Sequence, residues 1–301
     1  MIKKTQIHTE QPGRIISYFG NSVAVEGENG QVFHCHLRRN QALPIVGDWV
    51  NWQLSSGETG TITHILPRRT VLVRGNKYGE TKPVAANLDI LVIVTAPAPV
   101  FSDYLLDRYL VAAELLQIAP VVVFNKIDLL TEAEQHFALK QCMPYQHISY
   151  SVFLTSVINQ QGLDTLRDHL ETKTAALVGP SGVGKSSIIA ALTGQAIRMG
   201  DVSAKGAGKH TTTATHLYHL PEGGSLIDSP GVREFNLWKV TKQELLCGFK
   251  EFKPYLTQCK FRDCLHVTEP QCAIQTAVAN GEISATRYAN YKILLKDIAS
   301  D

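Results

Sequence analysis

The sequence predicts a multi-domain chain with an N-terminal OB-type β-barrel, a central α/β domain and a mainly helical C-terminal domain. Three observations lead to this prediction. Short alternating apolar stretches run from Gly13 to about Leu72, buried strands alternate with amphipathic helices from about Ala86, and three of the six cysteines cluster near the C-terminus. We expect the domains to span residues 1–80, 81–240 and 241–301.

The composition is that of a globular protein. The 301 residues are 44% hydrophobic, and the net charge of +2 argues against a protein that coats nucleic acid over its whole surface. The opening "MIKKTQIHTE" has no apolar run behind its lysines, and no apolar stretch approaches the ~20 residues of a membrane span. We therefore expect a cytoplasmic protein that makes no contact with a membrane. We also expect it to be a monomer.

The N-terminal domain is expected to be a five-stranded barrel. The stretches "RIISYFGNSVAVEG", "QVFHCHL", "DWVNWQL" and "GTITHIL" alternate in polarity between glycine-rich or polar turns. Barrels of this type often bind RNA, although many only hold partners. The arginines that could contact RNA, or could simply keep an edge strand soluble, are Arg38, Arg39, Arg68, Arg69 and Arg74.

The central domain is expected to hold a parallel sheet covered by helices on both faces, because apolar strands and amphipathic helices alternate along it. Strands are expected at 88–96, 120–126, 148–156 and 174–179, and helices at 104–117, 131–141, 163–172 and 184–194. Two further helical stretches, Cys272–Ala279 and Ile283–Ala299, lie in the C-terminal domain.

A phosphate-binding loop joins the last of these strands to the last of these helices. Its sequence "GPSGVGKSS" fits G-x-x-x-x-G-K-S, with the strand and helix that this motif requires. Glycines let backbone N–H groups turn toward phosphates, Lys185 should reach the β and γ phosphates, and the Ser186 hydroxyl should bind Mg²⁺. The expected phosphate-binding residues are Gly179, Pro180, Ser181, Gly182, Val183, Gly184, Lys185, Ser186 and Ser187.

A second motif, "NKID", is expected to select guanine over adenine, because it directly follows a buried strand. The Asp128 carboxylate can accept hydrogen bonds from the guanine N1–H and 2-amino group, which adenine lacks. Asn125 would hold neighbouring loops together, the stem of Lys126 would lie along the ring, and Ile127 completes the motif. In the later "LTSV", Ser156 would lie against the guanine O6.

Two segments after the phosphate loop are expected to sense the γ-phosphate. In "SLIDSPG", Asp228 would hold Mg²⁺ through water and the Gly231 N–H would contact the γ-phosphate. In "KGAGKHTTT", Thr212 would complete the Mg²⁺ shell, although the threonine run could also be the start of a strand. The base motif thus precedes the phosphate loop, which is the order of a circularly permuted GTPase domain.

The group that orients the attacking water is not the usual glutamine. Val232 stands at that place after Gly231, and its side chain cannot form hydrogen bonds. His210, in the "GKHTTT" segment, is the best catalytic candidate because imidazole can accept a proton near neutral pH. It could also be an ordinary exposed loop residue.

The cysteine-rich loop "CKFRDCLHVTEPQC" is expected to bind one structural zinc ion. Cys259, Cys264, His266 and Cys272 supply three thiolates and one imidazole, which leaves no ligand position open. The alternative is that these are separate buried cysteines. His216 and His219, two residues apart on an expected strand, are interpreted as ordinary surface or core residues.

Together, "LLDRYLVAAE", "NKIDLL", "GPSGVGKSS", "KHTTT", "DSPGVREF" and the cysteine loop resemble the small ribosomal subunit biogenesis GTPase family, RsgA, over nearly the whole chain. The resemblance implies GTP hydrolysis stimulated by the 30S subunit, action in its late maturation, and contact with 16S rRNA. The same zinc ligands and the role of His210 are also implied. An alternative is an RNA-binding assembly module that uses GTP only as a structural ligand, while Asp128 disfavours an ATPase or kinase.

Overall fold

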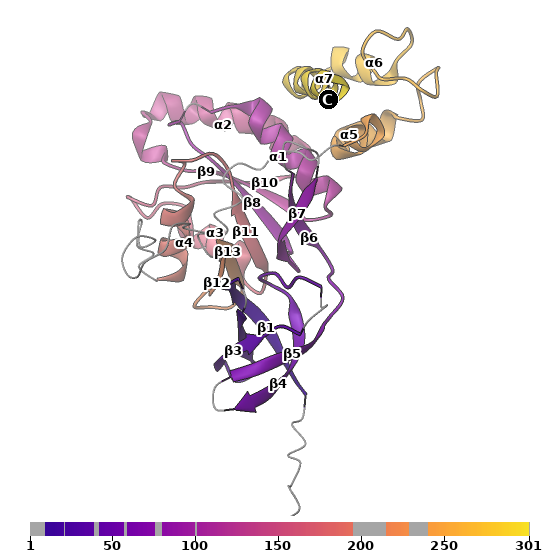
Figure 1. The fold of residues 1–301 in the computed structure, drawn as a ribbon. Helices are drawn as coiled ribbons and strands as arrows, with labels where there is room; N and C mark the ends of the chain where they lie inside the picture. The colour runs from indigo at the N-terminus through magenta and orange to yellow at the C-terminus, as the bar shows by residue number, and fades with distance from the viewer. Residues whose placement is uncertain are drawn as a thin grey trace, which may run out of the picture.

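The computed structural model describes most of the chain. The described residues are 10–300 apart from positions 21, 39–41, 57–58, 76–79, 100, 195–214 and 229–239. Figure 1 shows the barrel at one end, the α/β domain in the middle and the C-terminal helices beside α1. Within the described residues, no helix is both long and apolar enough to cross a membrane.

The N-terminal domain is a closed five-stranded barrel, as predicted. Its strands are β1 (Gln11–Tyr18), β2 (Ser22–Gly27), β3 (Val32–His36), β4 (Trp49–Ser56) and β5 (Thr59–Ile65). They pair in the ring β1–β2–β3–β5–β4–β1, in which only the β3–β5 pair is parallel. Alternate apolar side chains such as those of Ile15, Val25 and Trp52 fill the interior of the barrel. Successive side chains of a strand point to opposite faces, so the alternation of apolar and polar residues in the sequence matches the inner and outer faces.

The central sheet continues in the order β10–β9–β8–β11–β13–β12. Its strands are β8 (Ile90–Thr95), β9 (Ala119–Phe124), β10 (Ser151–Leu154), β11 (Thr174–Val178), β12 (His216–His219) and β13 (Ser225–Asp228). The pairs are parallel except β12 with β13. Strands β8 and β11 are buried along their whole length, as expected for a sheet that is covered on both faces.

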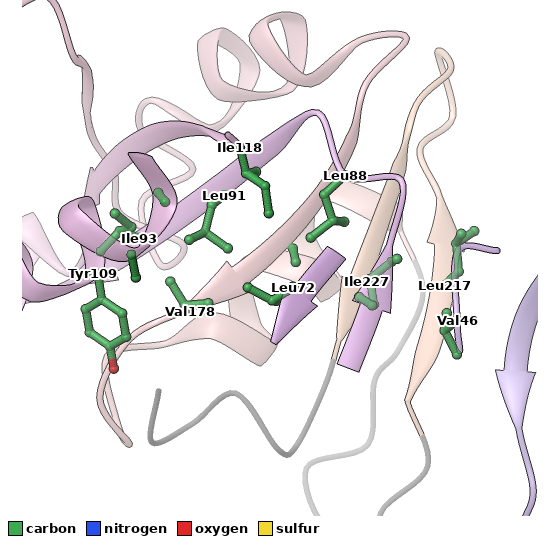
Figure 2. Packing of buried hydrophobic residues seen from close by; sticks show 14 of the residues in the cluster. Val46, Leu72, Leu88, Leu91, Ile93, Tyr109, Ile118, Val178, Leu217 and Ile227 are labelled. Carbon is green, nitrogen blue, oxygen red and sulfur yellow. The ribbon is translucent and has the colours of Figure 1, made fainter. Parts of the chain in front are cut away.

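Helices cover both faces of this sheet. They are α1 (Asp103–Leu115), α2 (Glu132–His147), α3 (Leu163–Leu170) and α4 (Lys185–Thr193). Helix α1 packs on one face, where Figure 2 shows Leu91, Ile93, Tyr109 and Val178 together, while α3 and α4 pack on the other. Helix α2 starts where predicted, with Thr131 as the N-cap of a capping box, but it runs six residues further, to His147, because Pro144 does not end it.

Two strand pairings were not expected from the sequence. Strands β6 (Val71–Gly75) and β7 (Thr81–Ala86) form a two-stranded sheet whose Leu72 packs against the central domain (Figure 2). Strand β12 pairs with β1 of the barrel, which lies beside it in Figure 1. The barrel and the central sheet are therefore one continuous eleven-stranded sheet.

The C-terminal domain packs on the outer side of α1. It contains α5 (Lys242–Gly248), the 3₁₀ helix η3 (Lys250–Tyr255), α6 (Ala273–Ala279) and α7 (Ala285–Ser300). Its core is built on Phe249, Phe252 and Tyr291. Gly248 allows α5 to approach α1 closely, because an added Cβ would lie 2.6 Å from a methyl group of Val111.

Candidate nucleotide-binding and metal-binding sites

The phosphate loop lies between β11 and α4, at the carboxyl edge of the sheet. Gly179, Gly182 and Gly184 all have positive φ angles, of 139°, 84° and 100°. A Cβ at Gly179 would lie 2.1 Å from the Val94 carbonyl oxygen. Only glycine fits this backbone path, so the spacing of the motif follows from the shape of the loop.

Lys185 closes over the loop that precedes it. Its Nζ donates hydrogen bonds to the carbonyl oxygens of Gly179 at 2.7 Å and Pro180 at 2.6 Å. Ser181 and Gly182 at the tip are exposed, while Val183 is buried beneath them and Ser186 and Ser187 are half-buried. The loop therefore presents a cation at the start of α4, where a helix terminus also favours anions.

Asn125 connects the base motif to the phosphate loop. Its buried Nδ2 donates to the Val183 carbonyl oxygen at 2.9 Å, and its Oδ1 accepts from the Thr155 hydroxyl at 3.0 Å. Both polar ends of the amide are thus fixed, which defines its orientation. Thr155 was not singled out in the sequence, because nothing local indicates that it faces a residue thirty positions away.

Asp128 and Ser156 come together from two different loops. The Ser156 hydroxyl donates to Asp128 at 2.5 Å, and it accepts from the Asn159 N–H at 3.1 Å. Ile127 is buried beside them, and the Lys126 ammonium donates to the Ala98 carbonyl oxygen at 3.2 Å. The predicted base-binding residues therefore form one cluster around a half-buried carboxylate.

Asp228 ends strand β13, which runs parallel to the strand before the phosphate loop. Parallel strands end at the same edge, so its half-buried carboxylate lies on the phosphate-loop side of the sheet. This placement suits a carboxylate that holds Mg²⁺ beside Ser186. His210, Thr212 and Gly231 lie outside the described residues.

The four predicted zinc ligands form a single cluster. The ligand atoms of Cys259, Cys264, His266 and Cys272 all lie within 4.8 Å of one another. His266 Nδ1 is 3.4 Å from the Cys259 Sγ and 3.3 Å from the Cys272 Sγ. Tetrahedral zinc bonds imply a sulfur–nitrogen separation of about 3.6 Å, so the cluster fits this metal.

Neighbouring side chains hold the ligand loop in this shape. Glu269 accepts backbone N–H bonds from Leu265, Val267 and Thr268 at 2.8–3.0 Å. Burial opposes its ionisation, but these hydrogen bonds outweigh burial and lower the pKa of Glu269 to about 2. Tyr288 donates to the carbonyl oxygen of His266 at 2.7 Å.

These supporting residues were missed in the sequence, because Glu269 resembles any loop carboxylate and Tyr288 lies on a later helix. Burial lowers the pKa of His266, although Glu269 opposes this shift. The neutral imidazole that results is the form that binds metals.

Two of the barrel arginines and the two histidines of β12 make structural contacts. Arg68 donates to the buried Asp48 at 2.7 and 2.8 Å, which supports a structural role, and Arg69 pairs with Asp89 at 3.0 Å. His216 bonds to Ser17, and His219 bonds to Glu26 at 2.8 Å. Arg38 and Arg74 are exposed, and Arg39 lies outside the described residues. Both histidines therefore join the central domain to the barrel, a role that their spacing in the sequence did not indicate.

The fold and the site define a class of protein. A phosphate loop, an N-K-I-D motif that comes earlier in the chain and a carboxylate at the same sheet edge are the parts of a circularly permuted P-loop GTPase. A solved structure described as YloQ, a circularly permuted GTPase, is similar with a TM-score of 0.79 and 29% identity, over 99% of this chain and 98% of that chain. YjeQ from Thermotoga maritima is similar with a TM-score of 0.81 and 31% identity, over 97% of this chain and 100% of that chain.

The sequence comparisons identify the family. The family model described as RsgA GTPase matches residues 65–238. The small ribosomal subunit biogenesis GTPase RsgA of Pectobacterium carotovorum is 43% identical over 303 residues, covering 98% of this chain and 87% of the relative. The protein of the same name from Haemophilus influenzae is 41% identical, covering 96% of this chain and 85% of the relative. The chain belongs to the RsgA GTPase family.

Proposed function

We propose that this protein binds GTP with Mg²⁺, hydrolyses it to GDP and phosphate, and is stimulated in this reaction by the small ribosomal subunit late in 30S maturation. Two contacts support this proposal most strongly. The hydrogen bond from Asn125 to Val183 joins the base motif to the phosphate loop, and the hydrogen bond from Ser156 holds the carboxylate of Asp128 in place. The names of the relatives support the ribosomal partner.

Base selection rests on the geometry around Asp128. The Ser156 hydroxyl donates to one oxygen of the Asp128 carboxylate and restrains this side chain. Because the side chain is already ordered, binding of a guanine edge would cost less conformational entropy. The Lys126 stem, held over the loop by its bond to Ala98, provides an apolar wall for the ring. Adenine would instead place its N1, which is an acceptor, and its C2–H against the carboxylate, so neither of the hydrogen bonds that guanine donates could form.

The phosphate end requires a rearrangement of Lys185. Its two bonds to Gly179 and Pro180 would be exchanged for bonds to the β and γ phosphates, while Ser186, Thr212 and Asp228 would hold Mg²⁺. Bound Mg²⁺ supplies charge neutralisation on the phosphate oxygens. Lys185 and the backbone N–H groups of the loop place the γ-phosphate, and the Gly231 N–H contacts it.

His210 orients the attacking water in this proposal. Val232 cannot do so, and free enzyme is therefore expected to be slow. His210→Ala should leave GTP affinity nearly intact and remove most of the turnover that small subunits stimulate, because a transition-state contact is lost. Phosphate release and nucleotide binding are measured on the same samples. Unchanged stimulated turnover would remove His210 from this role and point to a ribosomal group.

The flanking domains supply the ribosomal contacts in this proposal. Zinc held by Cys259, Cys264, His266 and Cys272 would fix the C-terminal domain, and the barrel would contact 16S rRNA. The protein would work as a cytoplasmic monomer. If GTP were only a structural ligand of an RNA-binding module, phosphate release would be equally slow with and without small subunits.

A further inference from the structure

One row of residues crosses the junction between the central sheet and the barrel. Asp228 lies opposite His216, His216 opposite Ser17, Ser17 opposite Ala24, and Ala24 opposite His34. Directly opposed residues project from the same face of a sheet. His34 of the barrel and His216 of the central domain therefore share one face, and Asp228 ends the row.

Four rings lie along this face, and we call them the ring strip: His34, Phe19, His216 and Tyr218. Phe19, which follows β1, has its ring centre 6.0 Å from that of His34 and 6.2 Å from that of His216. His216 is in turn 6.2 Å from Tyr218. The ring strip therefore bridges the two domains without a break at the junction.

The ring strip is accessible. Phe19 is 49% exposed although it is one of the largest apolar side chains, His34 is exposed, and His216 and Tyr218 are half-buried. An exposed phenylalanine held among other rings costs solvation free energy that a bound partner would recover. Unlike a single exposed ring such as that of Phe137, the row of neighbouring rings suits a partner that can use several ring faces in sequence.

An arginine beside the ring strip can pair with a polyanion. The exposed Arg38 follows β3, and His36, two residues after His34 on the same face of that strand, adds a further exposed ring. The Glu26 carboxylate is bonded to His219 at 2.8 Å, and Asp228 places a carboxylate only at the far end of the row. Unpaired nucleotides combine stackable bases with a negative backbone, and bases in single-stranded RNA stack on phenylalanine, tyrosine and histidine rings.

We propose that the ring strip binds unpaired bases of single-stranded RNA and carries the RNA-binding face of the barrel across the junction onto β12. The face formed by the second and third strands is the one that OB-type barrels use for oligonucleotides. This proposal rests on the proposed function in one respect, namely that the RNA bound in the cell is taken to be that of the small ribosomal subunit. RNA bound there would lie on the strand opposite Asp228, close to the Mg²⁺ end of the nucleotide site.

The test titrates full-length protein into a fluorescent 12-nucleotide RNA without secondary structure, at fixed salt, and follows anisotropy. Phe19→Ala should weaken binding at least about fivefold, because stacking on one aromatic ring is worth roughly 1–3 kcal/mol per base. Phe19→Tyr, which keeps the ring, should bind like wild type. Phe137→Ala is the matched control, since Phe137 is 62% exposed on the distant helix α2.

His34→Ala is a second, independent test of RNA binding by the ring strip. It should weaken RNA binding as Phe19→Ala does, and a duplex of the same length should be insensitive to both changes. Equal affinity of wild type, Phe19→Ala and His34→Ala for the single strand would overturn the proposal. The proposal would also be overturned if Phe19→Ala and His34→Ala lost association with small subunits but kept wild-type affinity for RNA, since that outcome indicates a protein partner.

The titration needs no GTP hydrolysis, so its failure and the failure of the proposed function are distinguishable. Phosphate release by free enzyme is measured on the same samples and should be unchanged in Phe19→Ala. Loss of RNA binding in a variant with normal basal turnover supports the ring strip. Absence of RNA binding in the wild type would overturn the ring strip while leaving the GTPase proposal intact.

Discussion

At the scale of single residues, the candidate site contains motif residues that can be recognised in the sequence and hydrogen-bonding neighbours that cannot. Lys185, Asp128 and the four candidate metal ligands stand in motifs whose spacing reflects a local backbone path, so the sequence could predict that each set comes together. Thr155 and Glu269 could not, because each acts through a hydrogen bond whose meaning depends on the folded neighbour. Motifs indicate candidate ligand-binding groups, and tertiary contacts show which residues hold those groups in place.

The choice of guanine should depend on Asp128. Asp128→Asn should weaken GTP binding by roughly 100-fold or more, because two hydrogen bonds to a charged group are worth about 1.5–3 kcal/mol each. Relative affinity for xanthosine triphosphate should rise, since its 2-oxo group can accept from the new amide. Competition between the two nucleotides measures this, with Asp164→Asn on the exposed surface of α3 as the control. A variant that still prefers GTP would remove Asp128 from this role.

At the scale of secondary-structure elements, the central strands and helices were predicted and the joining pieces were not. Strands β8 and β11 are uniformly apolar because both faces are buried, which is a strong local signal. The β6–β7 pair and the β12–β1 pair are short, and they depend on which surfaces meet after folding. Short pairings between domains leave little periodicity for a sequence to display.

The attachment of the C-terminal domain should depend strongly on one buried arginine. Arg287 is 1% exposed, contacts Asp107 of α1, and bonds to Glu251 at 2.6 Å. Arg287→Met should lower the opening free energy of α7 by about 3–5 kcal/mol, because it leaves two buried carboxylates without a cation. Native-state hydrogen exchange of the α7 amides measures this.

Arg167→Met is the matched control for this change. Arg167 pairs with an Asp164 side chain that is 84% exposed, so its replacement should cost no more than about 1 kcal/mol. If exchange in α7 were the same in both variants, the contact between Arg287 and Asp107 would not be what holds the C-terminal domain on α1.

The cysteine loop should bind one zinc ion per chain. A Cys259→Ser and Cys264→Ser double variant should lose it, because two ligands cannot complete a tetrahedral structural site. Elemental analysis of purified protein gives the stoichiometry, and Cys247→Ser provides the control, since Cys247 is exposed and outside the cluster. Stoichiometric zinc in the double variant would place the site elsewhere.

At the scale of the whole molecule, the permuted order has a structural consequence. The barrel is joined to β12, which pairs with the strand that ends in Asp228, and the C-terminal domain is joined to α1. The two flanking domains thus contact opposite parts of the GTPase domain. The order of motifs predicted the permutation, whereas these two attachments became visible only when the chain was folded.

The central claim is that this chain is a GTPase whose turnover depends on the small ribosomal subunit. The most direct measurement is single-turnover phosphate release from GTP by wild-type protein alone, with purified small subunits, and with purified large subunits. The proposed function predicts slow release alone and with large subunits, and a rate at least about tenfold higher with small subunits. Lys185→Ala should be inactive throughout, which tests for contaminating hydrolysis. Equal rates in the three conditions would contradict the account.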